Sequence, residues 1–582
     1  MDDKLKDILS RVRKPGRYIG CETNSVVKEH NPNRTSIVLA YPDTYEIGMS
    51  YLGLKILYHL INEREDALCE RVFAPWIDME KELLDNDMKL FSLETKRPMN
   101  KFDVVGFSLC YELTYTNVLN MLHLGGVTLL SKERKEEEPI VIAGGACCYN
   151  PEPMSPFFDA VVIGDGEEVI QTFIDVYRIS KKEGKDRRSI LKQLSKIEGV
   201  YVPSLYEAEY ENEKFMGLKS KEKDVLVEIK GAFVKDLENA YYPTKQLVPL
   251  VNIVQDRIAV EIMRGCPNKC RFCQASAINR PVRLRSPEKV RQILKEAYER
   301  TGYEKVSLLS LSSVNYPYLA DLVRTLTGYF KDKGVGISIP SLRIDKAFYE
   351  LPEMIAAIKK AGLTFAVEST DEKLRKDLAK EVDVEVLCRC AYEAFKHGWR
   401  RLKLYFIVGF SFQKENEADQ IMKLARELSV LKKEVTSSPA EIKVSVNAFV
   451  PKAHTPMQWL GMKDKKDLAE IREGLFRGKT KKVTVEFSNI DQSILEGCLS
   501  RAERKVGDVI YEAWKNGAKM DGWTEFFDVK VWEDAFRNKG MNMQEYAGKL
   551  YDINDVLPWE HIRTNTKKDW LRREFEEAEF SR

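Results

Sequence analysis

The sequence has no long apolar run, no excess of one charge sign, no low-complexity tract and no repeat beyond a strand–helix alternation. No stretch approaches the roughly 18 consecutive apolar residues of a membrane-spanning helix, which argues against a membrane protein. Lys+Arg 92 against Asp+Glu 90 gives a formal charge of +2, so there is no clear nucleic-acid footprint. The short basic run at residues 477–482 is typical of a solvated face.

The amino terminus also lacks the apolar core of a secretion signal, and we expect a cytoplasmic protein. With 44% hydrophobic and 31% charged residues among 582, the composition is that of a globular chain with several domains. Eleven cysteines in such a chain do not indicate a disulfide framework. Where cysteines cluster, they indicate metal ligands or redox chemistry; isolated ones indicate buried apolar side chains.

The first 180 residues alternate short apolar runs with amphipathic stretches. The runs lie at residues 36–41, 71–75, 103–109, 140–145 and 160–164. Nearly continuous β-branched runs separated by helical patterns are typical of a parallel sheet covered on both faces. They predict an α/β fold in which residues 1–180 form a doubly wound, flavodoxin-like Rossmann domain. Ligands of such domains bind at the carboxyl ends of the strands.

The rest of the chain divides into a connector, a second α/β domain and a helical end. Residues 181–245 are charged and irregular, with one hairpin expected at about Leu205–Val234. Six further apolar runs in about 200 residues are fewer than the eight strands of a full barrel. This pattern therefore predicts that residues 246–455 form a partial (β/α) barrel. Residues 456–582 have helical spacing and predict a helical C-terminal appendage.

One cysteine motif indicates the chemistry. Cys266, Cys270 and Cys273 stand in a C-x3-C-x2-C spacing directly after the first strand of the second domain. Three thiolates in eight residues converge on one cluster only if the chain forms a loop, which Pro267 and Asn268 favour. A four-iron cluster normally takes four cysteines, so three leave one iron open for a non-protein ligand. The alternatives are a zinc site, which needs further ligands, and unligated core cysteines.

With Phe272 in its aromatic position, this motif resembles the C-x3-C-x-aromatic-C motif of the radical SAM superfamily. The resemblance implies that Cys266, Cys270 and Cys273 bind a [4Fe-4S] cluster and that S-adenosylmethionine (SAM) binds the open iron. It also implies reductive cleavage of SAM to a 5′-deoxyadenosyl radical, with an electron donor such as flavodoxin or ferredoxin as partner. No separate catalytic residue is identified.

The same resemblance places candidate SAM contacts at the carboxyl ends of later barrel strands, where barrel sites are built. Ser310 and Ser312 occupy the position of a turn that contacts the SAM amino group, and Gly409 lies in an adenine-contacting segment. The other candidates are Ser341, Arg343, Glu368 and Val450. The alternative for the polar candidates is an ordinary role in capping or ion pairing.

Four short motifs in the first domain resemble, in order, those of cobalamin-binding domains. Asp43, Tyr45 and Gly48 match Asp-x-His-x-x-Gly in everything except the histidine. The other motifs contribute Ser108 and Leu109, Gly144 and Gly145, and Gly164, Asp165 and Gly166. Small residues at strand ends let a nucleotide-like tail lie between sheet and helix, and the resemblance implies bound cobalamin.

Tyr45 stands where such domains carry the histidine that ligates cobalt. A phenol with a pKa of about 10 is a poor metal ligand at neutral pH. If cobalamin binds, we therefore expect its lower face to be hydrogen-bonded, water-bound or vacant. The alternative is that binding has been lost and that the domain is a platform for substrate or protein.

Together the resemblances imply a cobalamin-dependent radical SAM enzyme, in the leading interpretation a methyltransferase that acts on an unactivated carbon. Two alternatives stay open. One is radical rearrangement, cyclisation or oxidation without methyl transfer, and the other is a sensor that binds cobalamin or a cluster. The upstream cysteines lie in the cobalamin-like domain, which disfavours methylthiotransferase chemistry. The substrate stays open among RNA, peptide and small molecule.

Overall fold

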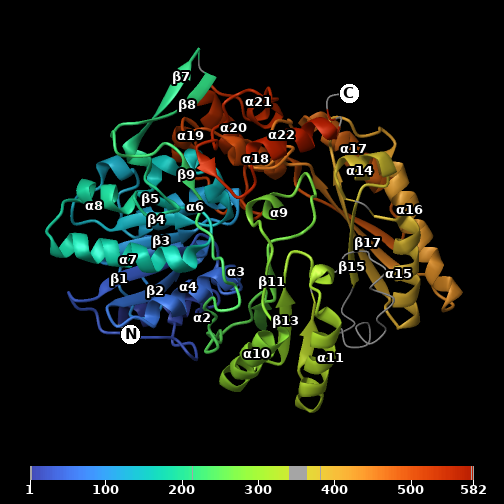
Figure 1. Ribbon diagram of the computed structural model, residues 1–582, viewed down its shortest axis with the longest axis horizontal. Helices are drawn as coiled ribbons and strands as arrows, with labels where there is room; N and C mark the ends of the chain where they lie inside the picture. The colour runs from blue at the N-terminus through green and yellow to red at the C-terminus, as the bar shows by residue number, and fades with distance from the viewer. Residues whose placement is uncertain (1–2, 213, 340–362, 381, 579, 581–582) are drawn as a thin grey trace.

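The computed structural model describes residues 3–212, 214–339, 363–380, 382–578 and 580. In Figure 1 two α/β parts stand side by side, the first in blue and the second in green to orange. The red C-terminal helices lie along the top of the view, between the two parts (Figure 1). In the described residues, no helix is both long enough and apolar enough to cross a membrane.

The first domain is built on a six-stranded sheet in the order β2-β1-β3-β4-β5-β6. Strands β1 to β5 are parallel, and β6 runs antiparallel to β5. Every residue of β1, β2 and β3 is buried, because both faces of the sheet are covered. The prediction of a flavodoxin-like sheet is confirmed. The strands are β1 Thr35–Tyr41, β2 Ala67–Phe73, β3 Val104–Ser108, β4 Ile140–Gly144, β5 Ala160–Val162 and β6 Val200–Tyr201.

Helices cover this sheet on both sides. α4 contacts α7 and α5 contacts α6, the two pairs that right-handed crossovers place on opposite faces of a sheet in this order. α7 begins directly after the carboxyl end of β5, so its amino terminus faces the ligand edge of the sheet. The helices are α1 Asp3–Arg11, α2 Gly16–Ile19, α3 Tyr45–Gly48, α4 Leu52–Asn62, α5 Ile77–Asp85, α6 Tyr115–Leu124, α7 Gly166–Lys182 and α8 Arg187–Leu194.

The connector contains the expected hairpin. β7 Tyr206–Glu211 and β8 Lys214–Ser220 pair antiparallel. β6 lies before them and completes the first sheet, which therefore extends beyond residue 180. β9 Ile229–Lys230 pairs with β19 Ile562–Arg563, so the connector also contacts a segment near the end of the chain.

The described strands of the second domain form two parallel sheets. Their orders are β10-β13-β14 and β15-β16-β17-β18, and all six predicted runs are present as strands. The strands are β10 Ile258–Glu261, β13 Lys305–Leu309, β14 Gly336–Ser338, β15 Leu363–Glu368, β16 Arg401–Val408, β17 Glu441–Ala448 and β18 Val483–Phe487, with an antiparallel pair, β11 Met263–Arg264 and β12 Arg283–Leu284. The helices are α9 Gln274–Ile278, α10 Pro287–Thr301, α11 Leu319–Phe330, α14 Glu372–Asp377, α15 Val384–Lys396, α16 Glu417–Leu431 and α17 Lys465–Arg477.

The C-terminal region is mostly helical, as expected, but it is joined to both domains. β18 lies inside this region and pairs with β17, and apolar residues of α18 to α21 share one core with the first domain. Helical spacing reveals an apolar face but not the partner that covers it. The helices are α18 Ile490–Arg501, α19 Val506–Lys515, α20 Val529–Asn538, α21 Met543–Gly548 and α22 Lys568–Glu577. The domain boundaries at residues 180, 245 and 455 stay predictions.

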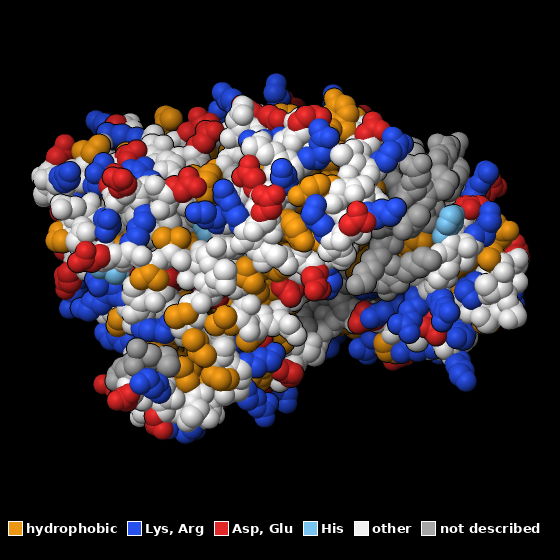
Figure 2. Space-filling model, turned by 90° about the horizontal axis from the view of Figure 1, so that it is seen from below, with side chains coloured by type: hydrophobic (Ala, Val, Ile, Leu, Met, Phe, Trp, Pro, Cys, Tyr) orange, Lys and Arg blue, Asp and Glu red, His pale blue; other side chains and the backbone are white. Residues whose placement is uncertain are grey.

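The surface carries charges of both signs. Figure 2 shows Lys and Arg interspersed with Asp and Glu over the face that it draws. This mixing matches the formal net charge of +2 for the whole chain. The face therefore has the character of an ordinary solvated surface and not that of a single-sign electrostatic field.

Candidate functional site

The three motif cysteines lie on the loop that joins β11 to β12. Gly265 begins this loop with φ +85°, a conformation that L side chains rarely adopt. A Cβ at this position would come within 2.5 Å of the carbonyl oxygen of Asn279, so the chain requires glycine here. Cys266 is buried, whereas Cys270 and Cys273 are partly exposed.

Two of the sulfur atoms accept hydrogen bonds from the loop itself. The side-chain amide of Asn268 donates to Cys266 Sγ at 3.2 Å, and the backbone N–H of Ser276 donates to Cys273 Sγ at 3.4 Å. Burial raises the pKa of Cys273 to about 11, and the neighbouring Cys270 and Cys266 add to the rise. A bound cation would remove this penalty, since metals take cysteine as the thiolate.

The donor set fits an iron–sulfur cluster better than a single ion. In the described ranges, no three His, Cys, Asp or Glu side chains gather as a single metal ion requires. A four-iron cube holds its thiolates farther apart than one ion does, and cysteine is the ligand that such cubes use. Cys266, Cys270 and Cys273 would therefore hold a cluster and leave one iron for another ligand.

A hydrogen-bonded chain connects the turn after β13 to the cysteine loop. Ser312 Oγ donates to Asn315 Oδ1 at 2.6 Å. The Asn268 amide that reaches Cys266 also donates to Asn315 Oδ1, at 3.0 Å. Ser312, a predicted SAM contact, is thus tied to one of the cysteines through two amides. Asn315 was not predicted, because no local pattern marks a residue whose partner is in another loop.

The predicted positions on later strands are held by their own contacts. Glu368 ends β15 with φ +69° and pairs with the buried Lys380 at 3.3 Å. Burial raises the pKa of Cys273, and the positive charge of Lys380 opposes part of this rise. Lys380 therefore favours the thiolate form of Cys273. Gly409 has φ +90°, and its N–H donates to Gln413 Oε1 at 2.7 Å. Sequence reasoning missed Lys380, which belongs to no motif.

Two predicted contacts lie in apolar surroundings. Phe272 packs against a cluster that includes Phe410 and Phe449. Val450 packs against the core that the first domain shares with the C-terminal helices. Ser341 and Arg343 lie outside the described residues.

A cavity of about 500 Å³ lies between the first sheet and the start of the cysteine loop. This volume is in the range of small-molecule sites. Six predicted residues at the carboxyl ends of β3, β4 and β5 line it: Ser108, Gly144, Gly145, Gly164, Asp165 and Gly166. The second domain contributes Glu261, Met263, Arg264, Gly265, Leu309, Ser310 and Leu311. The structure thus brings the predicted Ser310 together with three of the four cobalamin-like motifs.

The glycines of this cavity have two different roles. A Cβ on Gly144 or Gly166 would have its nearest neighbour at 3.7 or 3.6 Å, so these positions leave space that a side chain would occupy. Gly145 and Gly164 have φ +120° and +100°, and a Cβ there would meet a backbone carbonyl oxygen at 2.4 or 2.1 Å. Two glycines keep the cavity open, and two allow the tight backbone of its wall.

In the part of the chain that the structure describes, four of the predicted cobalamin positions stay outside the cavity wall: Asp43, Tyr45, Gly48 and Leu109. Asp43 accepts a hydrogen bond from Trp523 Nε1 at 3.0 Å. The N–H of Leu109 donates to the carbonyl of Gly144 at 2.7 Å, so Leu109 supports the wall through its backbone.

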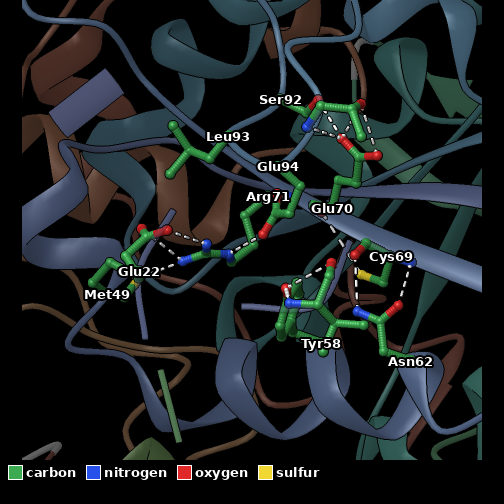
Figure 3. A network of polar contacts seen from close by, with 12 residues as sticks. Glu22, Met49, Tyr58, Asn62, Cys69, Glu70, Arg71, Ser92, Leu93 and Glu94 are labelled. Carbon is green, nitrogen blue, oxygen red and sulfur yellow. Dashed lines mark hydrogen bonds and ion pairs between the residues drawn. The ribbon is translucent and has the colours of Figure 1, made fainter. Parts of the chain in front are cut away.

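Tyr45 lies in a buried polar network, part of which Figure 3 draws. Its hydroxyl donates to Glu22 Oε1 at 3.0 Å. Arg71 pairs with Glu22 at 2.9 Å and with Glu94 at 2.7 Å (Figure 3). Burial, with the charge of Glu22, raises the pKa of Tyr45 far above its usual value. The structure therefore places this phenol in the network and not at the cavity.

Arg264, two residues before Cys266, joins the two walls of the cavity. Its guanidinium pairs with Glu167 at 2.7 Å and Asp165 at 3.1 Å, and with Glu261 of its own domain at 2.9 Å. Asp165 also pairs with Arg283 of β12, at 2.6 Å. These partly buried pairs fix the first domain against the base of the cysteine loop.

We expect Asp165→Asn to weaken this interdomain contact by about 2–5 kcal/mol, because Arg264 and Arg283 would keep their charges with one carboxylate fewer. Hydrogen exchange of the β11 and β12 amides, compared with the wild type, measures the effect. Asp175→Asn is the control, since Asp175 is 49% exposed and pairs with Arg64 inside the first domain. Equal exchange in the two variants would contradict the expectation.

Two protein-family models match the parts of the chain that form this site. Residues 260–425 match the radical SAM superfamily, and residues 53–203 match the N-terminal part of radical SAM proteins. These matches include the three cysteines and, except for Leu39, Tyr51 and Leu52, the residues that line the cavity. An uncharacterised protein of Methanocaldococcus jannaschii, MJ0966, is 25% identical over 515 residues, which cover 86% of this chain and 98% of that protein.

Two solved structures are similar over much of the chain. The radical SAM methyltransferase TsrM from Kitasatospora setae, with cobalamin and a [4Fe-4S] cluster bound, is 12% identical, with a TM-score of 0.49 over 73% of this chain and 74% of that one. The cobalamin-dependent SAM radical enzyme OxsB, with aqua-cobalamin and SAM bound, is 13% identical, with a TM-score of 0.45 over 94% and 79%.

Proposed function

Since this chain is a radical SAM protein, we propose that it is a cobalamin-dependent enzyme that transfers a methyl group to an unactivated carbon. Radical SAM domains bind a [4Fe-4S] cluster and SAM, and such enzymes need a reductant and a substrate. Cys266, Cys270 and Cys273 would hold the cluster, which when bound supplies the electron that cleaves SAM to a 5′-deoxyadenosyl radical. Flavodoxin or ferredoxin is the expected donor.

The interdomain cavity is the observation that supports cobalamin. It lies at the carboxyl ends of β3, β4 and β5, where doubly wound sheets bind ligands. Its opposite wall includes Arg264 and Gly265, the residues directly before Cys266. A corrinoid in this place would lie beside the cysteine loop and could supply a methyl group to a substrate radical.

The residues of the cavity suit a bound corrinoid without a histidine ligand. Apolar side chains such as Leu39, Phe107 and Ile142 exclude water from its inner wall. Ser108 and Tyr149, which carry hydroxyl groups, also line this space, and no histidine does so among the described residues. The lower face of a corrinoid would therefore be hydrogen-bonded, water-bound or vacant.

Anaerobic purification and cluster reconstitution provide the direct test. With SAM and dithionite, we expect 5′-deoxyadenosine, and with methyl-labelled SAM we expect label on protein-bound corrinoid. Failure to retain a corrinoid would overturn the cobalamin proposal. Formation of 5′-deoxyadenosine without transfer of label would favour radical chemistry without methyl transfer.

Gly144→Leu is expected to weaken corrinoid binding while iron content and SAM cleavage persist. A Leu side chain would occupy space that the cavity keeps free beside Gly144, whose own backbone is unstrained. Corrinoid absorption after gel filtration measures the loss, with affinity expected to fall about 5- to 150-fold for a clash of about 1–3 kcal/mol. Gly328→Leu is the control, since a side chain at this exposed position of α11 meets open space. Wild-type corrinoid content in Gly144→Leu would contradict the assignment.

A further inference from the structure

The end of the chain returns to the cysteine loop. Residues 564–578, here called the C-terminal strap, lie about 300 positions after the loop, and Arg271 and Glu574 are 303 apart. We propose that the C-terminal strap positions the cysteine loop, so that its three thiols are prearranged to accept iron. Figure 1 shows α22, which belongs to this strap, above α9 of the loop.

A buried ion pair is the strongest link between them. Arg271 stands between Cys270 and Cys273, and its Nε donates to Glu574 Oε2 at 3.0 Å. Arg271 and Glu574 are only 9% and 6% exposed. The same guanidinium donates through Nη1 to the carbonyl of Asp377 at 3.0 Å. The guanidinium also pairs with Glu577 at 3.5 Å, but the Glu577 side chain is 54% exposed. Without Glu574, a buried guanidinium beside two cysteines would keep only this longer, solvent-exposed pair, which destabilises the loop.

The strap also holds the part of the loop that follows the cysteines. α9 has five residues, too few to be a stable helix alone, and its last carbonyl groups need partners. Thr566 Oγ1 donates to the carbonyl of Ala277 at 2.6 Å, and Asn565 Nδ2 donates to that of Arg280 at 2.9 Å. The ring of Trp570 lies 4.7 Å from the Arg280 guanidinium. Side chains of the strap thus pair with one carbonyl of the short helix, that of Ala277, and with one of the segment that follows it, that of Arg280.

Aromatic packing completes the contact. Phe272, which precedes the third cysteine, packs in the apolar cluster that also contains Phe575 and Phe580. Phe575 belongs to the strap, and its ring is 5.6 Å from that of Phe580, which lies beyond the strap and is 4.9 Å from Phe412 of the second domain. The strap therefore contacts the loop at charged, backbone and aromatic groups, before and after Cys273.

These contacts define a positioning role that does not depend on cobalamin. A loop must hold its thiols in place before a cluster is assembled, and the described contacts are all made by protein groups alone. Ordering by the strap lowers the entropy that cluster binding would otherwise cost. Loss of the strap contacts should impair iron retention whether or not the enzyme transfers methyl groups, so the two proposals can fail separately.

Hydrogen exchange of the cluster-free protein tests the inference without relying on enzyme activity. In Glu574→Gln we expect amides between residues 271 and 280 to exchange about tenfold faster or more, from the loss of a charged hydrogen bond. After reconstitution and gel filtration, iron per chain should fall by a similar factor. Glu576→Gln is the matched control, because Glu576 lies on the exposed side of the same helix. Glu574→Asp, which keeps a carboxylate, should recover part of both losses.

A second variant distinguishes a local effect on the cysteine loop from general unfolding of the chain. Thr566→Val keeps the shape of the side chain and removes only the hydrogen bond to Ala277. Faster exchange confined to the loop, with unchanged circular dichroism, supports the proposal. It is overturned if both variants exchange like Glu576→Gln and retain iron like the wild type. It is equally overturned if protection falls evenly over the whole chain, because the strap would then be an ordinary part of the core.

Discussion

Cys270→Ala is expected to lower 5′-deoxyadenosine formation from SAM to the level of a reaction without protein. Cys270 is the middle donor of the loop, and its loss leaves Cys266 and Cys273 as the thiols of the motif. A cube that normally takes four cysteines would then have two, so it should not be retained through purification. Iron analysis, visible absorption and chromatographic detection of the nucleoside measure the change.

Cys388→Ala separates this effect from the general loss of a cysteine. Cys388 is a partly exposed residue of α15 and lies outside the motif. We expect this variant to bind iron and cleave SAM like the wild type. Undiminished cleavage in Cys270→Ala, with a wild-type amount of iron, would contradict the assignment of the cluster to this loop.

Together, Cys270→Ala and Glu574→Gln distinguish the ligands of the cluster from the groups that support them. The first removes a donor atom and should abolish cluster binding under all conditions. The second keeps all three donors, so a high concentration of iron and sulfide should restore much of the loading. This difference follows because a ligand contributes bond energy, whereas a positioning residue contributes only the free energy of ordering the loop.

The strands were predictable because burial on both faces gives each a continuous apolar run. β1 and β16 read directly as SIVLAY and RLKLYFIV, and both formed where the runs lie. β18 was missed although Val483, Val485 and Phe487 alternate with polar residues. This alternation marks a strand with one face less deeply buried, and it could have located the strand in a region otherwise typical of helices.

The cysteine loop was predictable since its donors are local in sequence, whereas the groups around it are not. Arg271 and Glu574 are 303 residues apart, and nothing in either segment indicates the other. The same holds for Arg264, whose carboxylate partners Asp165 and Glu167 come from the first domain. Motif positions give the residue type at a strand end, but not the direction in which a side chain such as that of Tyr45 points.

Arg71→Met is expected to destabilise the first domain by about 3–5 kcal/mol, because it leaves two buried carboxylates without their cation. Arg71 is 0% exposed and pairs with Glu22 and Glu94 (Figure 3). Its guanidinium also lies 5.0 Å from the ring of Tyr58. The midpoint of thermal unfolding of this domain should fall by about 6–20 °C, measured by differential scanning calorimetry.

The destabilisation of the first domain by Arg71→Met should be smaller in acid than at neutral pH. Burial raises the pKa of Glu94 even in the presence of Arg71. At Glu22 burial also acts to raise the pKa, but the charge and hydrogen bond of Arg71, with hydrogen bonds from the backbone and Tyr45, outweigh it and lower the pKa. Without Arg71, both folded-state pKa values should lie above the unfolded value, so folding would favour the protonated acids. That stabilisation is present below the unfolded pKa, near 4.5, and is lost as pH rises through the folded values.

The difference in unfolding midpoint between Arg71→Met and the wild type should therefore widen from pH 5 to pH 8. Arg11→Met is the matched control, because the Arg11 side chain is 42% exposed and its pair with Glu82 lies on the surface. A surface pair of this kind contributes about 0–1 kcal/mol, so its removal should shift the midpoint little at any pH. A shift in Arg71→Met that is as small as in Arg11→Met, or independent of pH, would show that the two carboxylates do not depend on Arg71.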